Sequence, residues 1–290
     1  MAKDDGALKR LGEVLADRYE ITDLLGSGGQ GHVYKALDRT AGDYVAIKVL
    51  RREFTDDPAW RERAQREARV LALLRNTAAV KVYDQKYAAD GALCIVMELL
   101  VGASFEDKLL ELDKAGIKIS PADLVPILDP IVSTLEVAHV NQVLHRDLKP
   151  DNIFILNDAT VRLIDFGFAR FQRLMRLTRV GQVAGSPSYL APECWTGDPD
   201  LVTHKIDVYS LGAVIFRALC GRPPFVGTPA HLIREVPRAP RPSLVALRPD
   251  VPAPVDDWVQ AALAAKPADR FDSVRALWTA FRLASGVGLG

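Results

Sequence analysis

The stretch "LGSGGQGHVYKA", Leu25 to Ala36, places four glycines within six positions, at 26, 28, 29 and 31, between two strand-like runs. Glycine inside a regular element costs about 0.5–1 kcal/mol of backbone entropy, so the chain must gain something from these residues. Two explanations stay open. The segment is a plain hairpin turn, or it is a loop whose backbone must approach a ligand closely, as in glycine-rich phosphate-binding loops.

Composition narrows the class of protein. The chain has 290 residues, with 37 Lys and Arg against 37 Asp and Glu, so its formal net charge is zero and bulk binding of nucleic acid or of a membrane surface is not expected. Three cysteines without a CxxC pair fit a reducing compartment. The N-terminus lacks the apolar core of a signal peptide, and no apolar run approaches the roughly 18–20 residues that span a bilayer. We expect a cytoplasmic protein without a membrane segment, and a homodimer stays open.

The pattern along the chain changes from strand-like to helical, which predicts an α+β protein with two lobes. Short β-branched and aromatic runs fill residues 19–100, and helical periodicity dominates residues 101–284. We therefore expect one domain, 19–284, with an N-terminal extension over 1–18 and a C-terminal tail over 285–290. Prolines between Pro223 and Pro254 predict extended connections.

One helix is expected to interrupt the strands of the small lobe, with Asp57 as its cap and Pro58 in its first turn. Its apolar face recurs at steps of four and three: Trp60, Ala64, Glu67, Leu71 and Leu74.

Two charges occupy positions where apolar residues are expected. In "VAIKVL", Lys48 shares a strand face with Ala46 and Leu50, and Glu67 lies on the apolar face of the helix. A buried Lys48–Glu67 ion pair would explain both, and buried pairs are more plausibly functional than stabilising. The alternative is an edge strand that exposes Lys48 to water.

Polar residues cluster in two further stretches. In "LHRDLKPDNIFI", Leu144 to Ile155, the spacing lets Asp147, Lys149 and Asn152 project from one tight loop. In "VRLIDFGFAR", Asp165 follows an apolar strand. Asn and Asp oxygens are hard ligands that suit Mg²⁺, and the alternative for either stretch alone is an ordinary polar loop.

These motifs together resemble the eukaryotic-type protein kinases in their bacterial Ser/Thr form. The resemblance covers about residues 19 to 283 and includes the glycine loop, "VAIK", the inward Glu67, "HRDLKPDN", "DFG", "APE" at Ala191–Glu193 and "DVYSLG" at Asp207–Gly212. It implies the protein-kinase fold, with a β-rich N-lobe and a mainly helical C-lobe.

The resemblance implies ATP as phosphate donor, with Lys48 on the α- and β-phosphates and Glu67 holding Lys48. Met97 resembles the family's gatekeeper, and backbone groups of Glu98 and Leu100 would hydrogen-bond the adenine. The expected ATP-binding residues are Leu25, Gly26, Ser27, Gly28, Gly29, Gln30, Gly31, Val33, Ala46, Lys48, Met97, Glu98, Leu100 and Phe154.

For the reaction, the resemblance implies that Asp147 orients the substrate hydroxyl and accepts its proton, while Lys149 neutralises the γ-phosphate. Asn152 and Asp165 would hold Mg²⁺, with Mn²⁺ as an alternative metal. Lys149, two residues after Asp147, resembles Ser/Thr rather than tyrosine kinases, so the expected partners are proteins that carry Ser or Thr.

Further roles follow from the same resemblance. Arg146 would receive a phosphate from the activation segment, with Thr178 as its candidate autophosphorylation site, and Ser186 would bridge the catalytic residues. A core spine would contain Leu71, Tyr83, His145 and Phe166. Structural roles fall to Glu193, Asp207 and Arg270: Asp207 would brace the catalytic loop, and Arg270 would pair with Glu193.

Two other classes of function predict different motifs. A non-catalytic scaffold with this fold predicts the loss of Lys48, Asp147 or Asp165, and all three are present. A small-molecule phosphotransferase of related fold usually lacks both "HRDLKPDN" and a complete "APE" segment, and both are present.

Overall fold

The structure is a computed structural model that describes residues 10–28, 31–51, 73–166, 187–196 and 198–288. The chain divides into two compact units, Met1–Val101 and Gly102–Gly290. Within the described ranges, no helix has both the length and the apolar character needed to cross a membrane.

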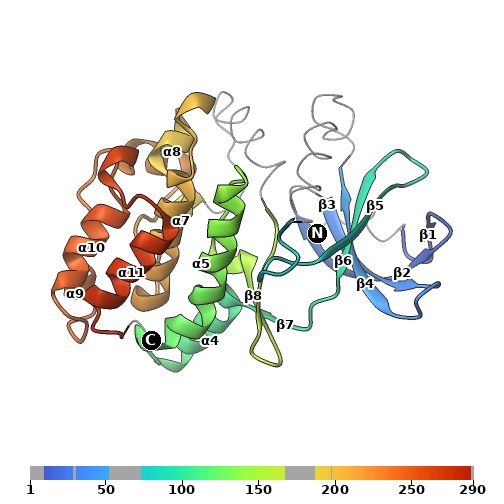
Figure 1. Cartoon of the computed structure of the whole chain (residues 1–290), viewed down its shortest axis with the longest axis horizontal. Helices are drawn as coiled ribbons and strands as arrows, with labels where there is room; N and C mark the ends of the chain where they lie inside the picture. The colour runs from blue at the N-terminus through green and yellow to red at the C-terminus, as the bar shows by residue number, and fades with distance from the viewer. Residues whose placement is uncertain (1–9, 29–30, 52–72, 167–186, 197, 289–290) are drawn as a thin grey trace. The chain divides into compact units, whose positions relative to one another are not determined.

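The N-terminal unit contains a six-stranded antiparallel sheet with the strand order β1-β2-β3-β4-β6-β5 (Figure 1). Its strands are β1 (Val14–Leu15), β2 (Tyr19–Gly28), β3 (Gly31–Asp38), β4 (Tyr44–Leu50), β5 (Val82–Tyr87) and β6 (Leu93–Glu98). The β2–β3 hairpin closes at the register pair Gly28–Gly31, so the glycine-rich stretch does join two strands.

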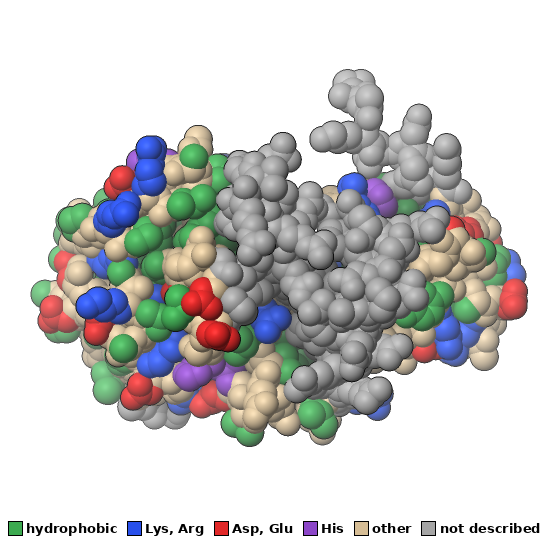
Figure 2. All heavy atoms as spheres, turned by 90° about the horizontal axis from the view of Figure 1, so that it is seen from above, with side chains coloured by type: hydrophobic (Ala, Val, Ile, Leu, Met, Phe, Trp, Pro, Cys, Tyr) green, Lys and Arg blue, Asp and Glu red, His purple; other side chains and the backbone are tan. Residues whose placement is uncertain are grey.

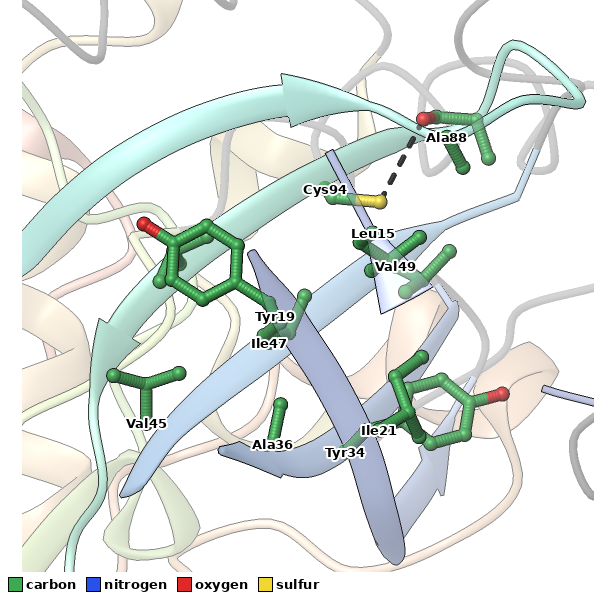
Figure 3. Packing of buried hydrophobic residues seen from close by; sticks show 12 residues of the cluster. Leu15, Tyr19, Ile21, Tyr34, Ala36, Val45, Ile47, Val49, Ala88 and Cys94 are labelled. Carbon is green, nitrogen blue, oxygen red and sulfur yellow. Dashed lines mark hydrogen bonds between the residues drawn. The ribbon is translucent and has the colours of Figure 1, made fainter. Parts of the chain in front are cut away.

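One face of this sheet carries the hydrophobic core of the unit (Figure 3). Tyr34, Ile47 and Val96, from three adjacent strands, are at most 1% exposed. Because strand residues alternate between faces, the neighbours of these residues lie on the opposite face of the sheet. Leu74, the last residue of the predicted helical stripe, is also buried.

The C-terminal unit is mainly helical and also holds a three-stranded sheet, β7 (Gly102–Ser104), β8 (Ile153–Leu156) and β9 (Val161–Leu163). Its helices are α4 (Phe105–Ala115), α5 (Val125–Val140), α7 (Lys205–Cys220), α8 (Pro229–Glu235), α9 (Leu244–Leu247), α10 (Pro254–Ala262) and α11 (Val274–Ala284). Helix α7 is the centre of the unit, buried along nearly its whole length and packed against α10 and α11 (Figure 1).

The surface of this unit carries mixed charge. On the face shown in Figure 2, Lys and Arg side chains lie interspersed with Asp and Glu, without a large patch of one sign. The arrangement agrees with a formal net charge of zero.

Several elements differ from the sequence-based expectation. Strand β1 lies inside the predicted N-terminal extension, and Leu15 joins the core at 3% exposure. The proline-rich region is not simply extended, because α8 and α9 form within it. Pro229 occupies the first turn of α8 and Thr228 caps it, since proline suits a position whose N–H needs no partner. The predicted tail begins with the buried Ser285, which caps α11.

Candidate active site

Lys48 lies on a central strand, because β4 is hydrogen-bonded to β3 on one side and to β6 on the other. The residue is 9% exposed. The alternative of an edge strand with Lys48 in water is therefore wrong. A buried ammonium is tolerated only where it interacts with anionic or polar groups.

Strand register collects the predicted nucleotide-binding residues on one face of the sheet. Val33 lies opposite Lys48, and Ala46 lies opposite Met97. Directly opposed residues share a face, as do residues two apart, so all four side chains lie on the face that is opposite the hydrophobic core. The half-buried Met97 contrasts with the buried core residue Val96 beside it.

The structure gives different explanations for the individual glycines that it describes in the β2–β3 hairpin. A Cβ on Gly31, which has φ of 154°, would lie 1.9 Å from the backbone oxygen of Val49, so packing against β4 requires a glycine there. Among the described residues, a Cβ on Gly26 or Gly28 would meet nothing within 4 Å, and neither residue has a positive φ. No described neighbour therefore requires a glycine at these two positions, which supports the explanation that a ligand approaches the backbone.

The segment after β6 supplies the predicted adenine contacts. The N–H of Glu98 already donates to the carbonyl of Lys81 at 2.9 Å. Within the described residues, the backbone N–H of Leu100 makes no hydrogen bond. Leu100 rather than Glu98 thus has a donor available for a ligand.

In the C-terminal unit, the buried carboxylate of Asp207 on α7 holds the backbone of the "HRD" loop. Its Oδ2 accepts the N–H of His145 at 2.8 Å, and its Oδ1 accepts the N–H of Arg146 at 2.9 Å. His139 Nε2 donates to Oδ2 at 2.8 Å. Burial would raise the pKa of the Asp207 carboxyl, but the bond and charge of His139 and the nearby His145 outweigh burial, so its pKa lies below the ordinary value.

These bonds hold a strained loop. Arg146 has φ of 65°, in the left-handed region that non-glycine residues rarely adopt, at a cost of order 1–3 kcal/mol. Such a conformation persists only where the surroundings determine it, and Asp207 provides that constraint. Sequence reasoning missed His139, because a histidine on a helix carries no signal for a bond to a residue 68 positions later.

His145 is fully buried and connects the loop to the strand that precedes Asp165. Its Nε2 donates to the carbonyl of Ile164 at 3.1 Å, so Nδ1 is left as the acceptor for the N–H of Asp147 at 3.3 Å. The His145 ring lies 4.8 Å from that of Phe166. Burial lowers the pKa of the His145 imidazole, which fits a neutral ring that donates from one nitrogen and accepts at the other.

Asn152 and Asp147 are locked together. The Asn152 side-chain Nδ2 donates to the backbone oxygen of Asp147 at 2.7 Å and to its carboxylate Oδ2 at 3.1 Å. The N–H of Ile164 donates to the backbone oxygen of Asn152 at 2.9 Å, which brings Asp165 to this loop. Both amide hydrogens of Asn152 are directed at Asp147, so its amide oxygen faces away as a hard ligand.

This donor set fits a divalent cation. The amide oxygen of Asn152 and the carboxylate of Asp165 are ligands that Mg²⁺ prefers, and two protein ligands suffice for an ion that also takes water and phosphate oxygens. Among the residues that the structure describes, no cluster of three or more His, Cys, Asp or Glu side chains is arranged to bind a metal. Lys149 lies near the loop, with its Nζ 3.6 Å from Oδ2 of Asp151. Phe154 is half-buried on β8.

Glu193 and Arg270 form a buried, bidentate ion pair with two bonds of 2.7 Å. The remaining guanidinium hydrogens donate to the carbonyls of Ala264, Lys205 and Ala265 at 2.8, 2.9 and 3.2 Å. All five donors of the arginine are therefore satisfied, which is the condition for a buried ion pair to be tolerated.

One residue predicted to belong to the core spine is not buried. Tyr83 is 57% exposed on β5 and so does not belong to a buried spine, because β5 is the edge strand of the sheet. Four residues of the helix predicted in the small lobe, Asp57, Pro58, Trp60 and Ala64, lie outside the described residues. So do six predicted site and spine residues: Gly29, Gln30, Glu67, Leu71, Thr178 and Ser186.

Comparisons with known proteins agree with this geometry. The model of the protein kinase domain family matches residues 19–281. The serine/threonine-protein kinase PknH of Mycobacterium bovis is 36% identical over 256 residues, which are 88% of this chain and 42% of PknH. PknA of Mycobacterium tuberculosis is 34% identical over 270 residues, 91% of this chain and 60% of PknA. The chain thus spans about two-fifths of the length of the PknH relatives.

The solved structures point the same way. The crystal structure of the M. tuberculosis PknI kinase domain is 29% identical, covers 96% of this chain and 99% of that chain, and superposes with a TM-score of 0.76. The two-lobe kinase fold predicted from the sequence is confirmed, and so is the resemblance to bacterial Ser/Thr kinases. The chain belongs to the protein kinase domain family.

Proposed function

We propose that this protein is an ATP-dependent kinase that transfers the γ-phosphoryl group of ATP to Ser and Thr hydroxyls of proteins. Its family uses ATP and a divalent metal. The observation that carries the proposal is the locked Asp147–Asn152 pair, which turns an amide oxygen outward beside Asp165 and keeps the Asp147 carboxylate in the same loop. The names of the relatives, which are Ser/Thr protein kinases, support the choice of hydroxyl.

The catalytic roles follow from charge and position. Mg²⁺, held by Asn152 and Asp165, would supply positive charge that neutralises the phosphate oxygens. Asp147 orients the acceptor hydroxyl and takes its proton, and its bond from Asn152 fixes the rotamer in which it does so. Phosphoryl transfer needs little covalent help from the protein, so alignment of this kind is the main contribution to rate.

In the N-terminal unit, Lys48 binds the α- and β-phosphates, and the backbone at Gly26 and Gly28 approaches the phosphates. The clear space around these glycines supports this role. Val33, Ala46 and Met97 contact the adenine from the face of the sheet that they share. Leu100 donates its backbone N–H to the base.

The proposal extends to regulation of the enzyme. Autophosphorylation of Thr178 would add about −2 charge near several arginines of the same segment, and Arg146 is the proposed receiver of that phosphate. A homodimer, a cytoplasmic location and Mn²⁺ as the alternative metal stay predictions from the sequence.

The test is transfer of radiolabelled phosphate from ATP to a basic protein, to a panel of small molecules, and without an acceptor. Asp165→Asn and Lys48→Met are expected to lower transfer to protein at least about a hundredfold, because each removes a charge that acts on the phosphates. The controls Asp257→Asn and Lys108→Met neutralise exposed residues of the C-terminal unit and are expected to keep wild-type turnover. Full transfer by Asp165→Asn would contradict the assignment, and label found only on small molecules would show a different phosphotransferase.

A further inference from the structure

A cavity of about 330 Å³ opens between α4 and the C-terminal end of α7, wholly within the C-terminal unit. Its apolar walls are formed by Leu109 and Leu112 of α4, by Ile117 and Ile119 of the following loop, and by Ala218 and Leu219 of α7. The volume is at the small end of the range of roughly 300–1,000 Å³ that small-molecule sites occupy. The cavity is separate from the residues assigned to the kinase reaction.

Part of the apolar lining is left exposed to water. Ile117 is 57% exposed and Leu247 is 37% exposed, and both line the cavity. Covering such surface with the apolar part of a ligand is favourable because it removes apolar area from water. The concave apolar surface therefore favours a ligand with a short hydrocarbon body.

Two of the three charges in the lining already have partners. Asp113 Oδ2 lies 2.9 Å from Arg217 Nη2, and Arg248 Nη2 lies 2.7 Å from Oδ2 of Asp250. Lys118, in contrast, makes no ion pair within the described ranges. The exposed ammonium of Lys118 is thus the charge that remains for a ligand.

The helix ends at the cavity are partly satisfied by the protein. Carbonyl groups at a helix C-terminus are partially negative, and several of those beside the cavity, together with one in the loop after α4, accept hydrogen bonds. The carbonyl of Leu112 accepts the N–H of Ile117 at 2.9 Å. The carbonyls of Leu219 and Ile119 accept from Arg248 Nη1 at 2.6 and 3.1 Å.

Cys220 also lines the cavity. Burial raises the pKa of its thiol to about 11, and Asp256 acts in the same direction, while Arg248, Arg222 and Lys118 act in the opposite one. Both oxygens of Asp256 are occupied by the start of α9: Oδ1 accepts the N–H of Leu244 at 2.7 Å, and Oδ2 accepts the hydroxyl of Ser243 at 2.6 Å. Asp256 is therefore already engaged within the protein.

We infer that this cavity binds a small amphipathic carboxylate, with its hydrocarbon chain against the apolar walls and its carboxylate beside Lys118. The inference does not depend on the proposed kinase activity, because none of the residues involved takes part in it. Octanoate is the probe, since it joins one short chain to one carboxylate.

The experiment measures binding of octanoate to the whole chain by calorimetry, and in parallel the rate at which a thiol reagent labels Cys220. Cys94 and Cys194 are 0% and 2% exposed, so labelling of the folded protein reports on Cys220, and mass spectrometry locates the label. Octanoate is expected to bind more tightly than octanol, and octanol more tightly than octylammonium. Bound octanoate is expected to slow the labelling of Cys220.

Variants then locate the site. Cys220→Phe fills the cavity and is expected to weaken octanoate binding more than tenfold, with an unchanged melting temperature as the check of folding. Lys118→Met is expected to weaken octanoate about two- to fivefold, the usual size for an exposed charge pair, and to leave octanol unaffected. The matched control is Lys114→Met, an exposed lysine of α4 outside the lining. Octanoate that fails to bind, that binds Cys220→Phe like the wild type, or that octylammonium outcompetes would overturn the inference.

Discussion

The glycine-rich hairpin and the "HRD" loop are positioned in different ways. The hairpin belongs to a sheet, where ladder hydrogen bonds set the register, with two shifts between β2 and β3, and alternation decides which face each side chain of β3 and β4 occupies. The loop has no ladder. Its backbone is held by side chains from distant parts of the chain, above all by Asp207. The Asp207 carboxylate accepts the N–H groups of Arg146 and His145, which lie 61 and 62 residues earlier in the sequence.

This difference predicts different responses to mutation. In the sheet, backbone hydrogen bonds from two neighbouring strands hold the strand that carries Lys48. Replacement of one side chain is therefore expected to leave the position of the strand unchanged. In the loop, one buried carboxylate accepts three hydrogen bonds, so its loss leaves several buried donors without partners. Removal of one side chain is therefore expected to cost more stability in the loop than in the sheet.

The buried Glu193–Arg270 ion pair lies outside both the hairpin and the "HRD" loop, and its loss is expected to have the largest effect on stability. Arg270→Met is expected to lower the free energy of unfolding by about 3–5 kcal/mol, because it leaves the Glu193 carboxylate buried and unpaired. Urea unfolding measures the loss. The double variant Glu193→Leu with Arg270→Met is expected to recover most of it, and a double variant no more stable than the single one would contradict the explanation.

Asp207→Asn tests whether the loop depends on one carboxylate. An amide offers a single acceptor oxygen, so at least one of the N–H groups of His145 and Arg146 loses its partner and faces an NH₂ group instead. We expect a loss of about 2–4 kcal/mol of unfolding free energy, from about 1–3 kcal/mol per unsatisfied group, together with a strong fall in phosphoryl transfer. Unfolding curves and transfer assays on the same preparation measure both. Transfer that persists at the wild-type rate would show that the loop holds its own conformation.

The hairpin glycines are expected to separate into two kinds. Gly31→Ala places a methyl group against the Val49 carbonyl and is expected to cost about 1–3 kcal/mol of stability. Gly28→Ala has open space and is expected to change stability by less than about 0.5 kcal/mol, while it raises KM for ATP. Thermal unfolding and ATP kinetics distinguish the two. An unchanged KM for ATP in Gly28→Ala would instead support the explanation that the segment is a plain hairpin turn.

The pH dependence of stability reports on His145. Because burial lowers its folded-state pKa, the unfolded chain takes up the proton first as the pH falls below about 6.5. Stability is therefore full above that pH and decreases below it, by at most about 1.4 kcal/mol per pH unit from this residue. Urea titrations between about pH 7 and 5 are expected to show a shallower slope for His145→Phe than for the wild type. His231→Gln, at an exposed histidine, is the control whose slope should stay as in the wild type.

The sequence alone was enough to predict the order of the strand-rich and helical regions and to identify most residues of the candidate site. Alternation in "VAIKVL" assigned Lys48 to the face of Ala46, and helical periodicity over residues 101–284 predicted the mainly helical C-terminal unit. These patterns work because they are local: a strand repeats every two residues and a helix every 3.6, whatever lies around them.

The tertiary structure decided what depends on long-range contacts. It made β4 a central strand rather than an edge, because strand order is set by pairing with β6, which lies more than 40 residues further along the chain. It also assigned Gly31 to packing against Val49, brought His139 to Asp207, and left Tyr83 on an exposed edge strand. None of these contacts leaves a periodic trace in the sequence, since each joins residues that become neighbours only when the whole unit packs.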